Sequence, residues 1–375
     1  MRNVVNIIRT ITGLVFIFSG FVKGDDPFGF AYRIEDYFVV YHLNWLIPLA
    51  LTFSIAMCTI EFVLGVMLLL KLRIRITAVL VLIMMAFFTI LTFNDALTNL
   101  VPDCGCFGDA IKLTNWQTFY KNIVLIIFAF IIFVNRRKQD TSLPPKRQWS
   151  YAFMASVVFV FFSVYCCVHL PLIDFTEWQA GHKLFAENPL PQKYYLTYKN
   201  IKTGEQKEYL SPNYPFSDSV WIAQWKFVSQ RVEDPNVYYG RNLQITDSSG
   251  VDLTARVIRD PGYVFLLTSM DMRSAAKAKL AGMNGFANQV IKSGGSFVLL
   301  AANTPSEAIR IARQEGLIYP VCFADDIILK TMVRSNPGLM LLHNGVVVKK
   351  WHYRDFPDFG DVSSRYLRHS NIKGQ

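Results

Sequence analysis

The stretch Asp103-Cys104-Gly105-Cys106-Phe107-Gly108-Asp109 joins two long apolar runs, residues 74–93 and 116–134. Each run is long enough to cross a hydrocarbon core of about 30 Å as a helix. The stretch is therefore predicted to be a loop at a membrane surface. Two thiols separated by one glycine can close a strained ring, exchange with an outside disulfide, or be unrelated small residues of a turn.

The composition places the whole chain in a membrane. Of its 375 residues, 52% are hydrophobic and only 18% are charged, which is too apolar for an ordinary soluble globule. The net charge of +10 does not indicate nucleic acid, because the basic residues are clustered beside apolar segments instead of along one amphipathic face. They are better interpreted as signals of membrane topology.

Three further apolar runs complete a set of five predicted spans: residues 4–22, 45–70 and 149–170. The first run could instead be a cleavable signal peptide. An uncleaved helix is favoured because Phe18-Ser19-Gly20 is a poor cleavage site. Residues 23–44, between the first two spans, are predicted to form a polar loop with turn-forming Pro and Gly.

The lysines and arginines near the spans lie at alternate ends of the predicted helices. Because such residues concentrate in cytoplasmic loops, the N-terminus is predicted to be cytoplasmic and everything after residue 170 periplasmic, with the helices in a bacterial inner membrane. The cysteine loop would then share an oxidising compartment with the C-terminal half. The basic residues used are Arg2, Arg9, Lys71, Arg73, Arg75, Arg136, Arg137, Lys138, Lys146 and Arg147.

The C-terminal half divides into two parts. Residues 171–259 are predicted to be a β-rich connecting region without a recognisable site. In residues 260–375 short apolar strands alternate with helical stretches, and an Asn344-Gly345 turn closes a final hairpin.

This second part resembles the thioredoxin fold, in which a cis proline at the position of Pro337 lies beside a redox dithiol. Enzymes of that fold carry Cys-x-x-Cys where residues 268–273 contain no cysteine. Cys322 stands alone, and free cysteines are commonly buried. The resemblance therefore implies an exported domain that binds a partner instead of catalysing exchange.

The membrane half resembles the DoxX and MauE group of four-helix membrane proteins. The resemblance lies in residues 18–24, in the intramembrane Glu61 followed by Gly65, and in Cys104-Gly105-Cys106-Phe107-Gly108. It covers about residues 1–138. Residues 139–170 would add a cytoplasmic linker and a fifth helix. The fusion looks like redox-associated membrane proteins of Bacteroidetes-type bacteria, and it implies a thiol role for the loop.

Glu61 lies inside a span, where a carboxyl group is costly unless it is neutral or paired. It is a candidate acid supporting the cysteine pair, or one member of a structural pair. Lys23 is explained by extension of its ammonium group to the interface, and Cys58 by packing. Cys166 and Cys167 are possible thiol partners of the loop, although only one can face it, because neighbouring helical residues point about 100° apart.

Two function classes remain. In the first, a possible thiol-disulfide oxidoreductase passes electrons between Cys104 and Cys106 and a periplasmic client protein held by the exported domain. A quinone is a possible cofactor, and no metal spacing is convincing. In the second, the protein is a non-enzymatic scaffold or assembly factor whose exported domain binds an envelope partner. Absence of Cys-x-x-Cys favours the scaffold, and the paired loop cysteines favour the redox class.

Overall fold

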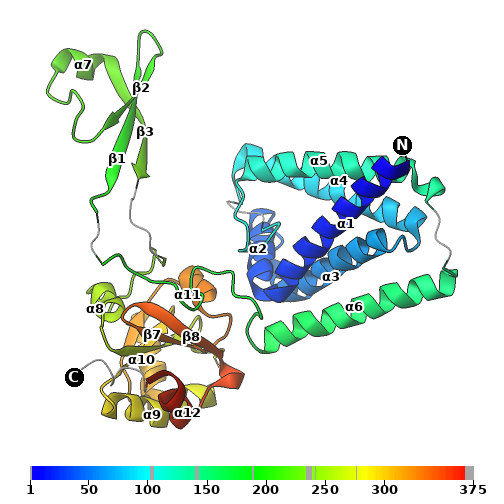
Figure 1. Cartoon of the computed structure of the whole chain (residues 1–375). Coiled ribbons are helices and arrows are strands. Elements are labelled where there is room, and N and C mark those ends of the chain that lie inside the picture. The colour runs from blue at the N-terminus through cyan, green and yellow to red at the C-terminus, as the bar shows by residue number, and fades with distance from the viewer. Residues whose placement is uncertain are drawn as a thin grey trace, which may run out of the picture.

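The computed structural model describes residues 2–101, 105–139, 143–187, 190–233, 239–240, 242–275 and 277–367, with the backbone alone at positions 2, 277 and 278. Cys104 therefore lies outside the described residues. Within them, five helices are long and apolar enough to cross a membrane, which confirms the predicted spans (Figure 1). They are α1 (Arg2–Asp25), α3 (Ala50–Leu69), α4 (Ile74–Thr98), α5 (Asn115–Val134) and α6 (Pro145–Val168).

The prediction of a polar loop over residues 23–44 is wrong. Helix α2 (Pro27–Val40) fills most of it, followed by the 3-10 helix η1 (Asn44–Leu49). Pro27 is compatible with the first helical position because its missing N–H would be unsatisfied there, and the Asp26 side chain caps the helix by accepting from Gly29 N. Apolar residues recur at helical spacing behind these turn formers, so one face is buried against α3. The buried α2 residues are Pro27, Phe30, Ala31 and Ile34.

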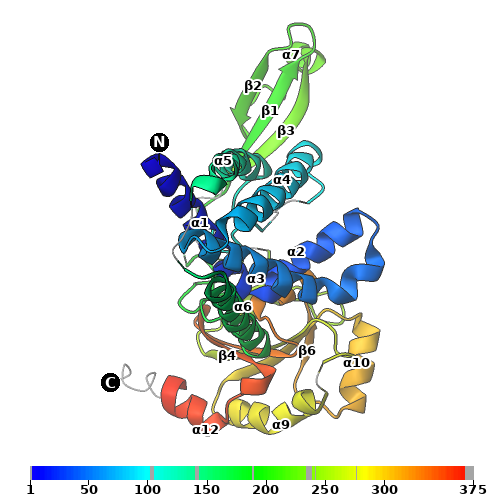
Figure 2. The ribbon, with the colours of Figure 1, turned by 90° about the vertical axis from the view of Figure 1, so that its right-hand side faces the viewer.

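Helices α1 and α3 pack closely because glycines lie between them. A Cβ atom at Gly65 would lie 2.8 Å from the Gly13 carbonyl oxygen, and one at Gly20 would lie 2.8 Å from the Phe62 nitrogen. Small residues allow this approach, which supplies packing where no hydrophobic effect drives helices together in lipid. Helix α6 lies outside the other four spans (Figure 2) and stacks Phe159 on Phe62 of α3, with ring centroids 4.3 Å apart.

The C-terminal α/β domain has a five-stranded sheet of order β6-β5-β4-β7-β8. Strands β4, β5 and β6 are parallel, β7 is antiparallel to β4, and β8 is antiparallel to β7. The peptide bond before Pro337 is cis, as the resemblance implied. The strands are β4 (Tyr263–Ser269), β5 (Ser296–Ala301), β6 (Val321–Phe323), β7 (Gly338–His343) and β8 (Val346–His352).

Helices cover both faces of this sheet. One core lies under α9 (Lys277–Lys292), α10 (Pro305–Gln314) and α12 (Phe359–Val362), and the other under α8 (Thr254–Ile258) and α11 (Asp326–Met332). Trp178, Leu184 and Ile245 are buried in the second core, so both ends of the connecting region pack on this domain. The short helices η2 (Arg136–Lys138), η3 (Tyr353–Asp355) and η4 (Ser363–Leu367) complete these regions.

A separate three-stranded sheet of order β2-β1-β3 forms in the connecting region. It consists of β1 (Lys193–Asn200), β2 (Gln206–Leu210) and β3 (Trp225–Glu233), with α7 (Ser219–Gln224) at its tip. Aromatic rings of Tyr198, Tyr209 and Trp221 pack together in place of a larger core. The sheet points away from the α/β domain (Figure 1).

Candidate functional site

Lys23, near the end of α1, forms a buried ion pair with Glu61 of α3. The two residues are 4% and 8% exposed. The expectation that the Lys23 ammonium extends to the interface is therefore wrong: α1 continues to Asp25, and the side chain reaches Glu61 inside the bundle. The same ammonium lies 5.0 Å from the centroid of the Phe30 ring. Because an intramembrane charge pair is costly, its presence marks this place as a candidate site.

The described part of the cysteine loop lies against α1 and α5. The Ser19 hydroxyl donates to the Cys106 carbonyl oxygen at 2.7 Å. The centroid of the Phe107 ring lies 5.7 Å from that of the Phe18 ring and 4.5 Å from the Lys121 ammonium. Gly108 has a φ of +52°, which favours glycine and lets the chain turn tightly. These contacts hold Cys106 at the mouth of the bundle.

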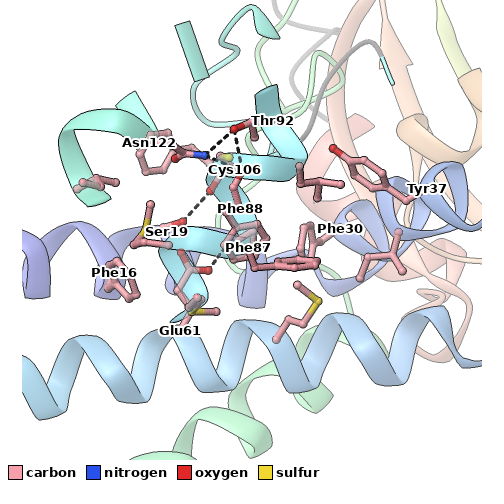
Figure 3. Close-up of a pocket in the computed structure, with 18 of the residues that line it drawn as sticks. Phe16, Ser19, Phe30, Tyr37, Glu61, Phe87, Phe88, Thr92, Cys106 and Asn122 are labelled. Atoms are coloured by element: carbon pink, nitrogen blue, oxygen red, sulfur yellow. Dashed lines mark hydrogen bonds and ion pairs between the residues drawn. The ribbon is translucent and has the colours of Figure 1, made fainter. Parts of the chain in front are cut away.

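A cavity of about 370 Å³ lies between the spans, directly beneath the loop. Figure 3 shows Glu61, Ser19 and Cys106 on its wall together with several phenylalanine rings. On the α4–α5 side, the Asn122 amide donates to the Thr92 hydroxyl at 3.0 Å. The cavity is therefore apolar, with a small number of fixed polar groups, as ligand pockets usually are.

Asp25, the last residue of α1, fixes the point where α6 ends. Its carboxylate accepts hydrogen bonds from Leu172 N at 2.9 Å and Ile173 N at 3.1 Å, and from the Cys166 thiol at 3.7 Å. Cys166 is 1% exposed, and Cys167 is partly buried. The structure thus places Cys166 against α1, which leaves its predicted thiol exchange with the loop a prediction. Cys58 is fully buried in a cluster with Phe30 and Phe159.

Asp26 and Asp109 both bind Arg334, which follows α11 of the α/β domain. The guanidinium reaches Asp26 at 2.8 Å and Asp109, in the cysteine loop, at 3.1 Å. Arg334 is 5% exposed. Burial alone would lower the pKa of Arg334, but the two carboxylates hold it above its ordinary value. Burial raises the pKa of Asp109, and Arg334 opposes that shift. One buried arginine therefore joins the start of α2, the loop and the α/β domain.

A second cavity, of about 500 Å³, lies where these three parts meet. The loop contributes Gly105, Gly108 and Asp109 to its wall, and α11 contributes Lys330. Cys106 and Phe107 line the apolar cavity instead. The loop therefore borders both the apolar space among the spans and a space under the α/β domain that several charged residues line.

The position of the missing dithiol is occupied by a polar network. The Ser269 hydroxyl donates to Asn336 Oδ1 at 2.9 Å, and the Asn336 amide donates to the Asp271 carbonyl oxygen at 3.0 Å. Met270, in the same segment, accepts from the Tyr32 hydroxyl of α2 at 3.6 Å. This end of the domain therefore faces the membrane half. Cys322 lies in the second core, 5% exposed, as predicted for a small buried residue.

Sequence reasoning did not find Asp25, Asp26 or Arg334 as site residues. The signal was faint: two acids that follow Lys23 and Gly24, and an arginine three residues before the cis proline. Neither pattern specifies a partner. The rigid packing of the two halves brings these side chains together.

Comparison with known proteins finds one family model and a set of solved structures. The model of the family described as "Methylamine utilisation protein MauE" matches residues 1–135. No curated protein matches the chain. Similar solved structures include a putative protein disulfide isomerase from Bacteroides thetaiotaomicron, with 14% identity and a TM-score of 0.28, covering 33% of this chain and 83% of that one. Another is the mitochondrial 2-Cys peroxiredoxin from Plasmodium falciparum, with 14% identity and a TM-score of 0.26, covering 35% and 92%.

The family match covers the first four spans, with α2 and the cysteine loop between them. The five-stranded mixed sheet with helices on both faces and a cis proline before β7 is thioredoxin-like. The protein is a multi-pass membrane protein in which a MauE-like membrane domain is joined to a thioredoxin-like domain in one chain.

Proposed function

We propose that this protein exchanges thiols and disulfides at Cys104 and Cys106 with a client protein held by the thioredoxin-like domain. The proposal rests on one observation: both the membrane half and the α/β domain contact the cysteine loop. Ser19 binds it from the membrane side at 2.7 Å, and Arg334 binds its Asp109 from the α/β domain at 3.1 Å. A client held by that domain would lie close to the loop.

The exchange needs no reactant other than the client and the loop cysteines, because the electrons and protons that one loses are gained by the other. A client dithiol attacks the loop disulfide, a mixed disulfide forms, and the second client thiol resolves it. Two electrons and two protons leave the client and reduce Cys104 and Cys106 to thiols. The reverse reaction reduces a client disulfide. A one-residue spacer strains the ring that Cys104 and Cys106 would form, which favours transfer of the disulfide over its retention.

Disulfide exchange requires an oxidising compartment, so the proposed function implies that the cysteine loop faces the periplasm. The turn between α3 and α4 and the segment after α5 lie at the end of the spans opposite the α/β domain (Figure 1). These two segments contain Lys71, Arg73 and Arg137. We propose that this basic end is cytoplasmic and that the α/β domain is periplasmic, in a bacterial inner membrane.

Thiol trapping in cells tests the function. Cys106→Ser should leave Cys104 able to hold a mixed disulfide with a client, visible as a band on a non-reducing gel that disappears with reductant. Cys322→Ser is the matched control. The Cys322 thiol is buried in the α/β core, so this substitution should leave the band unchanged. Absence of any mixed disulfide, with unchanged thiol states across the envelope, would exclude the redox function.

A scaffold or assembly factor is the second candidate. The internally bonded network of Ser269, Asp271 and Asn336 favours it, because that end of the domain has no thiol chemistry. In a scaffold, replacing both loop cysteines with serine would preserve client binding and the cellular phenotype. In the redox protein, binding would persist but client oxidation would be lost.

A further inference from the structure

The apolar cavity beneath the loop has walls suited to a flat ring. Phenylalanine side chains surround it, and methionines, which adapt to irregular shapes, fill the spaces between them. At about 370 Å³ the cavity falls within the usual range for small-molecule sites, about 300–1,000 Å³. The aromatic and methionine residues concerned are Phe16, Phe30, Phe38, Phe87, Phe88, Phe107, Met57, Met84 and Met85.

The cavity extends to the outer surface of the bundle. Tyr41, Leu43 and Phe87 line it, yet they are 43%, 38% and 56% exposed. Phe87 belongs to the middle of the spanning helix α4, where exposed side chains meet lipid. A ligand dissolved in the bilayer can therefore enter from the side without crossing water.

Several of the polar residues that line the cavity are buried. Lys23 and Glu61 form the ion pair described above, and Asn122 donates to Thr92 on the opposite side (Figure 3). Such groups can donate hydrogen bonds to carbonyl oxygens, and Lys23 and Glu61 can also carry protons. The chemistry that fits is a planar apolar ring bearing carbonyl oxygens, adjacent to a cysteine.

We propose that this cavity binds a lipid-soluble quinone, which reoxidises the loop cysteines. In this step, which rests on the proposed function, Cys104 and Cys106 lose two electrons and two protons and form one S–S bond. The quinone gains both electrons and both protons and becomes the quinol. Lys23 and Glu61 are placed to pass protons at the quinone oxygens. Binding itself needs no cysteine, so it can be measured separately from the redox step.

Binding is tested with decylubiquinone and the full-length Cys104→Ser/Cys106→Ser variant in lipid nanodiscs. Leu91 lines the cavity, whereas the neighbouring Ile90 is 71% exposed on the same helix. Leu91→Trp should weaken binding about tenfold or more, because the larger ring occupies volume that the ligand needs. Ile90→Trp should bind like the parent. Met84→Trp, matched to Ile83→Trp, provides a second block should Leu91→Trp not fold.

The outcomes separate the two proposals. Saturable binding lost in Leu91→Trp and retained in Ile90→Trp supports the quinone site. Equal binding in all variants, or phospholipid as the sole occupant after extraction, overturns it. Electron transfer is then measured in a chain retaining Cys104 and Cys106 alone, where one quinol should form for each pair of thiols lost. Binding without quinol formation would exclude the redox step and leave the binding site in place.

Discussion

Arg334 and Asp26 lie 308 residues apart in sequence and form a two-point ion pair at the junction of the two halves of the protein. The Arg334 Nε atom lies 2.8 Å from Asp26 Oδ2, and an Nη2 atom lies 2.8 Å from the same oxygen. The same guanidinium binds Asp109 of the cysteine loop. Such planar, forked contacts suit arginine and would not be reproduced by lysine. Docking of the α/β domain and position of the loop are therefore coupled through one side chain.

Replacing this arginine should release the domain. Arg334→Gln leaves two partly buried carboxylates near each other without a cation. Loss of one partner of a buried pair costs about 3–5 kcal/mol. In an otherwise cysteine-free chain, Tyr32→Cys and Met270→Cys should be joined by a short bis-maleimide, and Arg334→Gln should slow that reaction severalfold. Arg313→Gln, exposed on α10, is the control. Equal cross-linking in both variants would contradict the coupling.

The Lys23–Glu61 pair should show strong non-additivity. Lys23→Met and Glu61→Met each leave one intramembrane charge without its partner, so each should destabilise the membrane domain by about 3–5 kcal/mol. The double variant removes both charges and should lie closer to the wild type. Thermal unfolding of purified protein in detergent, followed by circular dichroism, measures these differences. If the double variant were destabilised by the sum of the two single effects, the two groups would not be acting as a pair.

The proposed orientation predicts reporter activity at two positions. A fusion after Gln139, near the basic end of α5, should report cytoplasm, because lysine and arginine concentrate on that side. A fusion at Gly250, within the region that packs on the α/β domain, should report periplasm. A periplasmic signal at Gln139 would reverse the topology and place the cysteine loop in a reducing compartment.

His352 should make the α/β domain sensitive to acid. It is 4% exposed, and burial lowers its pKa to about 4. The unfolded chain therefore binds a proton near pH 6.5 while the folded chain binds it near pH 4, so stability falls as the pH drops through this window. His352→Gln should reduce the slope of the free energy of unfolding against pH by up to about 1.4 kcal/mol per pH unit. Denaturant midpoints of both proteins between pH 7 and 4 provide the measurement, and parallel curves would refute the assignment.

Most helices and strands could be predicted from local sequence patterns, without knowledge of tertiary contacts. The spans were readable because a helix crossing lipid needs about twenty apolar residues, and the order of strands and helices after residue 262 was readable from periodicity. The prediction of a loop where α2 forms was wrong for a physical reason. Asp26, Pro27 and Gly29 resemble a turn by type, yet they form a helix start when the following apolar face can be buried against α3.

The sequence by itself determined which segments enter the membrane, which form the α/β domain, and that a Cys-Gly-Cys sequence stands between two of the spans. Only the tertiary structure decided that Lys23 pairs with Glu61, that Asp25 holds the end of α6, and that Arg334 binds Asp26 and Asp109. Hydropathy and periodicity act over a few neighbouring residues, so they encode local structure and burial. The partner of a buried charge is set by how two rigid bodies pack, and that information is spread over contacts across the whole chain.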